Sequence, residues 1–216
     1  MGLARLLALV FCGLAACAGP GGSGRPGDAT RLQERLAARA ARWVGHAGTF
    51  SGGDARFRAD CSGYVEAVYA AEGLPLRRLA ALAAPGEPSG AAALHRAVVT
   101  YGVAFGGGGE WPAPGDLVFF HDTYDRDRNG GADDRFTHVG IVESVSGGTV
   151  VFLHRGGKAV VRAVLTPDRP LVARDGERVL NSPLREKRRE AHAPALAGAL
   201  FAGYGRLDLR RVAAAR

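Results

Sequence analysis

Apolar residues recur at helical spacing in the first half of the chain and in short extended runs in the second half. Three segments of the first half carry an apolar stripe of period 3.6, and each is followed by a glycine of the kind that ends helices. The predicted helices span residues 30–44, 60–72 and 89–101. The carboxyl-terminal region, at about residues 200–209, adds a last helical turn and a strand.

Four short segments of the second half are rich in Val, Ile and Phe and are bounded by Gly, Pro or Asp, which is typical of strands. They span residues 117–121, 138–145, 149–154 and 159–165. The short connections favour an antiparallel meander. Helices followed by strands predict an α+β domain in which the helices pack on one central antiparallel sheet.

The first residues differ in composition from the rest. Arg5 precedes an uncharged run at 6–16 that is too short to span a bilayer, which indicates an export signal over residues 1–16. Small residues before Cys17 resemble the lipobox of bacterial lipoproteins, in which the cysteine after the cleavage site is acylated. An ordinary secretory signal with a chance cysteine is the alternative.

The remaining chain divides into a tether and one domain. Residues 17–28 predict a lipidated Cys17 and a flexible, Gly- and Pro-rich tether. Residues 29–216 form the domain, with a core at about 30–165 and a carboxyl-terminal extension. An anchored protein would be exported to the cell envelope, and because Ala18 is not the aspartate that often retains lipoproteins at the inner membrane, a Gram-negative host would place it at the outer membrane facing the periplasm.

The chain is basic, with a formal net charge of +7 that falls to +6 without residues 1–16, which carry Arg5 and no acidic residue. This charge fits an anionic wall polymer. The sequence shows no nucleic-acid motif and no aromatic residues interleaved with the arginines, so nucleic acid is not expected as a partner.

Cys61 is the one cysteine that stays in the predicted domain, because Cys12 leaves with the signal and Cys17 carries lipid. A free thiol in an exported protein is either a buried small residue or a reactive group. Asp60 is a good N-cap, which places Cys61 in the first turn of a helix, where the helix dipole is expected to lower the thiol pKa.

A cysteine nucleophile needs a base and a group that orients the base. Of His46, His95, His121, His138, His154 and His192, two lie at ends of predicted neighbouring strands. If Ser146, Gly147 and Gly148 form a three-residue hairpin loop, His138 and His154 become diagonal neighbours on one face. A two-residue loop would place them on opposite faces.

Several segments taken together resemble the NlpC family of cell-wall cysteine peptidases. The resemblance covers about residues 30–165 and rests on Asp60-Cys61-Ser62-Gly63-Tyr64-Val65, Pro114-Gly115-Asp116-Leu117-Val118-Phe119-Phe120, His138-Val139-Gly140-Ile141-Val142 and His154, in this order. It implies a papain-like fold with Cys61 as nucleophile, His138 as base and His154 as the third polar residue. Phe50 departs from the family, which often has a tyrosine hydroxyl at this place.

The resemblance also implies an activity. Peptidoglycan would be the partner, and the reaction would be hydrolysis of a stem-peptide bond between D-glutamate and a diamino acid through a thioester acyl-enzyme, with no cofactor required for catalysis. An amidase that cuts between muramic acid and L-alanine is one alternative. A non-catalytic wall-binding lipoprotein, favoured by Phe50, is the other.

The segment before His138 carries a possible calcium loop. Asp125, Asp127 and Asn129 alternate before Gly130, and Asp133 takes the ninth position of an EF-hand-like pattern. The twelfth position is Phe136 instead of a bidentate acid, so Asp122 or Asp134 would have to substitute. A solvated acidic turn without metal is the alternative.

Overall fold

The computed structural model describes residues 26–87, 89–106, 109–185 and 195–215. The helices are α1 (Pro26–Ala41), α2 (Cys61–Ala71), α3 (Leu76–Ala83), α4 (Ala91–Tyr101), α5 (Ala197–Leu200) and α6 (Leu209–Ala214). The strands are β1 (Phe50–Gly52), β2 (Ala55–Phe57), β3 (Gly102–Phe105), β4 (Leu117–Phe120), β5 (His138–Ser146), β6 (Thr149–Arg155), β7 (Val160–Leu165), β8 (Arg174–Asp175), β9 (Arg178–Val179) and β10 (Phe201–Leu207). In this part of the chain no helix has the length and apolarity needed to cross a bilayer.

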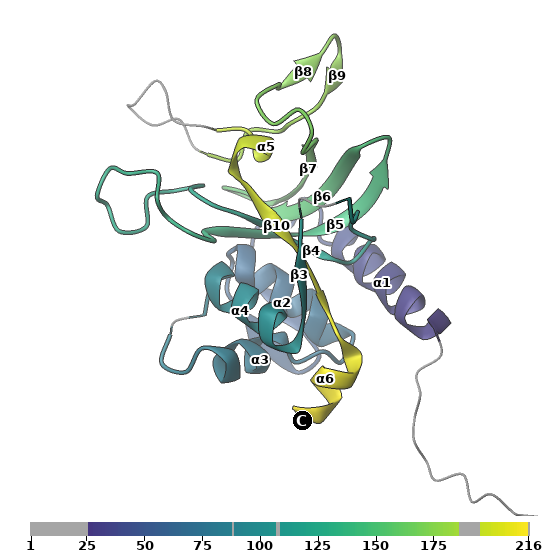
Figure 1. Ribbon diagram of the computed structural model, residues 1–216. Helices are drawn as coiled ribbons and strands as arrows, with labels where there is room; N and C mark the ends of the chain where they lie inside the picture. Colours follow the sequence, from purple (N-terminus) through teal and green to yellow (C-terminus); the bar gives the residue numbers. More distant parts are fainter. Residues whose placement is uncertain (1–25, 88, 107–108, 186–194, 216) are drawn as a thin grey trace, which may run out of the picture.

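A six-stranded antiparallel sheet of order β3-β10-β4-β5-β6-β7 forms the centre of the molecule. Helices α2, α3 and α4 lie on one side of it, and α5 with the β8–β9 hairpin lies on the other (Figure 1). Alternate residues of β4 belong to the two opposite cores, with Leu117 and Phe119 on the helical side and Val118 and Phe120 on the other. The strands at the centre are thus buried on both faces, and the predicted α+β class is confirmed.

The carboxyl-terminal segment is part of this sheet and not an appendage to it. Strand β10 inserts between β3 and β4, so the meander of β4 to β7 makes up only four of the six strands. The turn before β4 fastens this arrangement, because the buried Asp116 accepts hydrogen bonds from Nε and Nη2 of Arg206 at 2.9 and 2.6 Å and from Gln33 at 2.9 Å. One carboxylate thereby joins β4, β10 and α1.

The predicted boundary between the tether and the first helix is wrong. Helix α1 begins at Pro26, so residues 26–28 are helical and not part of a tether; Asp28 in the first turn complements the helix dipole. Helix α4 ends at Tyr101 with Gly102 as its C-cap, as predicted. Gly102 also opens β3, where a Cβ would lie 2.0 Å from the carbonyl oxygen of Arg206 on the neighbouring strand. The signal, Cys17 and residues 18–25 lie outside the described residues.

Candidate active site

The amino terminus of α2 is built around Asp60. Its Oδ1 accepts hydrogen bonds from the Gly63 amide at 2.7 Å and from the Ser62 hydroxyl at 2.8 Å, as expected of an N-cap. Its other oxygen pairs with Nε of Arg58 at 2.8 Å. This network fixes the position of Cys61, the first residue of the helix, and the predicted cap is confirmed.

Steric crowding explains why a glycine, Gly63, stands two residues after Cys61. A Cβ on Gly63 would lie 2.2 Å from the carbonyl oxygen of Arg58, so no side chain fits where the chain enters the helix. The next turns bury Tyr64, Val65 and Val68 against the sheet. The Asp-Cys-Ser-Gly sequence therefore describes a capped helix start that lies close to its preceding loop.

The thiol of Cys61 lies against the start of β5, where the backbone amide of Val139 reaches it. Burial, followed by the adjacent Asp60 carboxylate, raises the pKa of Cys61 from its ordinary 9.0 to about 11, although the amides of Val139 and Ser62 act in the opposite direction. The expected lowering of the Cys61 pKa is thus wrong. The cap that holds the helix in place also brings a negative charge beside the sulfur.

The hairpin between β5 and β6 has a two-residue turn and not the predicted three-residue loop. Ser146 pairs with Thr149, and Gly147 and Gly148 have φ values of 53° and 74°, as a type I′ turn requires. A shift of register between Val142 and Ser144 then inserts one extra residue in β5. The bulge offsets the shorter turn and returns His138 and His154 to one face.

The two imidazoles are in contact. Nε2 of His138 and Nδ1 of His154 are 2.8 Å apart, with the rings edge to face, so their expected proximity is confirmed. Gly140, beside His154, has no space for a side chain, because a Cβ would lie 2.8 Å from the carbonyl oxygen of Leu153. Burial lowers the pKa of His154 from 6.5 to about 4. Burial and then His154 hold the pKa of His138 well below 6.5.

Cys61, His138 and His154 line one cavity of about 670 Å³. Its wall also includes the side chains of Tyr124 and three arginines, which sequence reasoning did not single out: Arg58, Arg155 and Arg185. Tyr124 and Arg185 come from irregular segments, where neither period nor motif marks them. Arg155 directly follows His154, and that position at the end of a strand was the one available signal.

Phe50 does not line this cavity. Its side chain is 1% exposed and packs against the rings of Trp43 and Tyr64. Tyr124 does line the cavity, and the pKa of its hydroxyl is raised by burial and then by the charge of Cys61. Phe50 is therefore part of an aromatic cluster, and Tyr124 is the tyrosine that lines the cavity.

The other histidines lie elsewhere or outside the described residues. His95 stacks on Phe136 with ring centroids 3.7 Å apart, and Nδ1 of His121 accepts the amide of Phe136. Nε2 of His46 donates a hydrogen bond to the carbonyl oxygen of Thr49 at 2.9 Å. His192 falls in the range that is not described.

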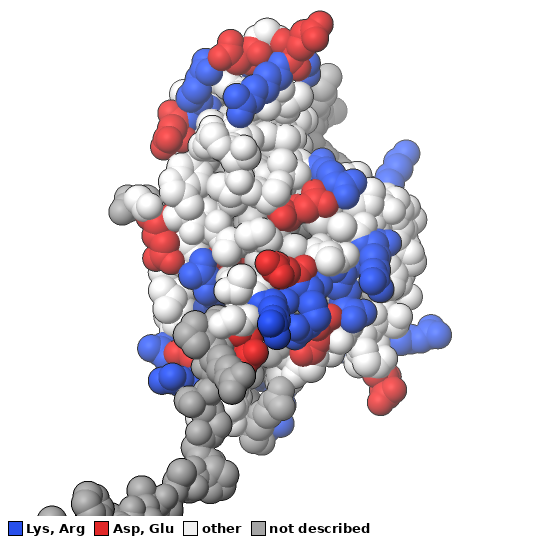
Figure 2. Space-filling model, turned by 90° about the vertical axis from the view of Figure 1, so that its right-hand side faces the viewer, with Lys and Arg blue, Asp and Glu red and all other residues white. Residues whose placement is uncertain are grey.

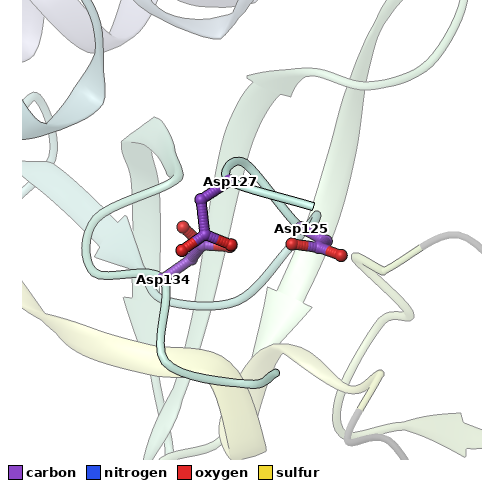
Figure 3. Close-up of side chains that lie close together, drawn as sticks. All are labelled: Asp125, Asp127 and Asp134. Carbon is purple, nitrogen blue, oxygen red and sulfur yellow. The ribbon is translucent and has the colours of Figure 1, made fainter. Parts of the chain in front are cut away.

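The β4–β5 loop, residues 121–137, gathers carboxylates in part as predicted. Carboxylate oxygens of Asp125, Asp127 and Asp134 lie within 4.8 Å of one another (Figure 3). Asp134, one of the two residues expected to substitute for the missing twelfth ligand, is in this group. Asn129 and Asp133 were predicted ligands, but Nδ2 of Asn129 donates to Asp127 at 2.9 Å and faces Asp133 at 3.4 Å, which places an amide donor and not an oxygen between these carboxylates.

The same loop connects to the cleft. Thr123 and Thr137, at its two ends, are joined by a hydrogen bond of 2.9 Å between their hydroxyls and both line the cavity. Tyr124 follows Thr123 and His138 follows Thr137. A change in the conformation of this loop would therefore move residues of the cavity wall.

Acidic side chains are interspersed among the basic ones over the face that Figure 2 draws. Several ion pairs lie at the surface, among them Arg162 with Glu143 at 2.7 Å and Arg169 with Asp175 at 2.7 Å. The excess positive charge of the chain is thus not arranged as one stripe on this face.

No family model matches the sequence, and no curated protein matches it significantly. Among solved structures, the chain is similar to a Staphylococcus aureus protein described as similar to a lipoprotein of the NLP/P60 family, with 25% identity and a TM-score of 0.36. The match covers 61% of this chain and 36% of that one, so the chain spans little more than a third of that protein's length. A TM-score of this size assigns neither fold nor family.

Proposed function

We propose that the protein is a papain-like cysteine peptidase that hydrolyses peptide bonds of peptidoglycan. The observation that supports it most is the meeting of three groups in one cavity: a thiol at a helix start, a partly buried imidazole on the facing strand, and a second imidazole 2.8 Å from the first. Nucleophile, base and orienting group are the parts that covalent acyl transfer needs. The resemblance of the Cys61 and His138 segments to the NlpC family supplies the substrate class.

The contact between the histidines supports Nδ1 of His138 as the base. When Nε2 of His138 donates to Nδ1 of His154, Nδ1 of His138 keeps its lone pair and is the atom that accepts a proton. His154 would thus hold the tautomer and the ring orientation, the role that a carboxylate or amide has in other triads. A neutral partner fits the low pKa of both rings.

The raised pKa of Cys61 and the lowered pKa of His138 support a resting state in which the proton is on sulfur and His138 is neutral. As the sulfur forms its bond to the substrate carbonyl carbon, the thiol proton passes to Nδ1 of His138, and this imidazolium then protonates the leaving amine as the C–N bond breaks. Water attacks the resulting thioester, giving its proton to His138, and the C–S bond breaks to restore the thiol. The amide of Cys61 is a candidate donor to the oxyanion.

Fragments released from purified peptidoglycan test the proposal and identify the bond. Mass spectrometry of a digest by the purified protein is expected to show products cut between D-glutamate and the diamino acid. Products cut between muramic acid and L-alanine would establish the amidase alternative. Intact peptidoglycan, with binding retained, would establish the non-catalytic alternative.

Two further proposals concern attachment to the envelope and calcium binding. Acylation of Cys17 would hold the protein at the cell envelope, and a Cys17→Ala variant is then expected in the soluble exported fraction.

The carboxylates of Asp125, Asp127 and Asp134 are proposed to bind calcium, since this ion prefers several oxygen ligands. The calcium would order the loop that carries Tyr124 and would take no part in the chemical step.

A further inference from the structure

The cavity wall carries more positive than negative charge. Three arginines line it, whereas Asp60 is its one acidic residue among those described. Arg58 is paired with that aspartate at 2.8 Å. The positive charges of Arg155 and Arg185 are therefore without an acidic partner in the cavity wall.

Arg185 is the more unusual of the two. Its side chain is 6% exposed, and its Nε and Nη1 atoms are buried with no hydrogen-bond partner among the described residues. Its position is fixed by the preceding residue, because Leu184 packs against the core on the far side of the sheet and donates its amide to the carbonyl oxygen of Ala195 at 2.7 Å. The guanidinium is held at the cavity and does not extend into solvent.

A buried guanidinium with unsatisfied donors is costly in the free protein, since both its charge and its N–H groups lose water. Such a cost is found where a ligand supplies the missing partner. Guanidinium donors form a planar fork that matches a carboxylate, and Arg155, whose Nε is also buried without a partner, adds a second positive charge.

We propose that Arg185 binds a free carboxylate of the substrate and selects peptides that carry one close to the bond that is cut. This inference rests on the proposed peptidase activity. A D-glutamyl residue linked through its side chain meets the requirement, because its α-carboxylate remains free a few bonds from the scissile carbonyl. Arg185 would then be a specificity residue and Cys61 and His138 the catalytic ones.

Two synthetic peptides separate this role from a structural one. L-Ala-γ-D-Glu-L-Lys with a free α-carboxylate on D-glutamate is compared with the same peptide carrying an α-amide there. The protein is expected to prefer the carboxylate peptide by roughly 10- to 100-fold in kcat/KM, the range for a lost hydrogen bond to a charged group. Arg185→Gln should remove this preference by slowing cleavage of the carboxylate peptide alone, whereas the control Arg169→Gln, a surface arginine, should keep it.

Equal cleavage of both peptides by the unaltered protein would overturn the proposal, as would an Arg185→Gln variant that loses activity on both equally. If neither peptide is cleaved, the peptidase proposal fails on that substrate, and calorimetric titration of Cys61→Ala with both peptides decides the point about Arg185. Tighter binding of the carboxylate peptide, lost in the double variant with Arg185→Gln, supports it. Absence of binding, or equal binding, overturns it.

Thermal unfolding without substrate gives an independent readout. Because the guanidinium is buried without partners, Arg185→Met should raise the melting temperature of the free protein. The carboxylate peptide should raise the melting temperature of Cys61→Ala more than the amide peptide does. A lower melting temperature for Arg185→Met would mean that Arg185 stabilises the fold, and would contradict the assignment.

Discussion

Nε2 of His138 and Nδ1 of His154 lie 2.8 Å apart even though the two-residue turn of their hairpin would, in a regular ladder, set them on opposite faces. The extra residue of the bulge near Glu143 accounts for this. Since a shift of one residue exchanges the two faces of a strand, the turn and the bulge together are equivalent to a longer loop. The contact between the histidines depends on both.

Burial of His154 predicts a loss of stability on acidification. Its pKa is about 4 in the folded protein and 6.5 when unfolded, so between these values the unfolded chain binds a proton that the folded protein does not. Stability therefore falls as the pH is lowered from 6.5 to 4, by on the order of 3 kcal/mol for this group.

The measurement is denaturant unfolding at several pH values for the protein and for His154→Gln. The variant should lose stability less steeply across this window, although His138, whose pKa is also lowered, keeps part of the slope. Parallel curves for the two proteins would show that His154 is not buried in its neutral form.

Cys61 is expected to react slowly with a small alkylating agent at neutral pH. A rise of its pKa from 9.0 to about 11 leaves about 100-fold less thiolate at pH 7. The rate of carbamidomethylation by iodoacetamide, followed at Cys61 by peptide mapping, should still be rising at pH 10. A plateau near neutral pH would instead indicate a thiolate held by a protonated His138. Slow labelling is thus not evidence against a catalytic role.

The buried Asp116, which joins β4, β10 and α1, is expected to contribute strongly to stability although it lies far from the cavity. Asp116→Ala should lower the free energy of unfolding by about 3 kcal/mol, since Gln33, the Ala113 amide and Arg206 all lose a buried acceptor. Glu110 is a matched control: it faces the same guanidinium at 3.4 Å but is exposed, and Glu110→Gln should cost under about 0.5 kcal/mol. Equal losses in the two variants would contradict the argument from burial.

Much of the fold could be predicted from residue patterns because the core elements have regular periods. The helix that begins at Cys61 and the four strands of the meander follow from apolar spacing and a cap. Helix α3 was missed although Leu76, Leu79 and Ala80 have helical spacing, since it is only eight residues long and directly follows Pro75. The pairing of β10 between β3 and β4 joins residues distant in sequence, which no local period indicates.

The cysteine and the two histidines of the candidate site could be predicted from the sequence, but the hairpin geometry and the pKa of Cys61 could not. Asp60 and the glycines around the hairpin identified Cys61, His138 and His154. The bulge could not be predicted, because a Gly-Gly pair fits either loop length. The direction of the Cys61 pKa was wrong because helix position was considered without burial and without the charge of Asp60. Arg185 has no signal in the sequence pattern, since only its burial and its lack of hydrogen-bond partners among the described residues mark it.

Calcium is expected to stabilise the β4–β5 loop. Millimolar calcium added to chelator-treated protein should raise the melting temperature, and Asp127→Asn should reduce that response, because Asp127 contributes an oxygen to the carboxylate group. Asp175→Asn, an exposed acid that pairs with Arg169 away from this loop, is the matched control and should leave the response unchanged. An identical melting temperature with and without calcium would remove the calcium proposal.

The central claim is that Cys61 cleaves peptidoglycan as a nucleophile. The most direct measurement compares muropeptide release from purified peptidoglycan by the protein and by Cys61→Ala, with circular dichroism to show that the variant is folded. Loss of release in a folded Cys61→Ala variant is the predicted result. Undiminished release by that variant would contradict the claim.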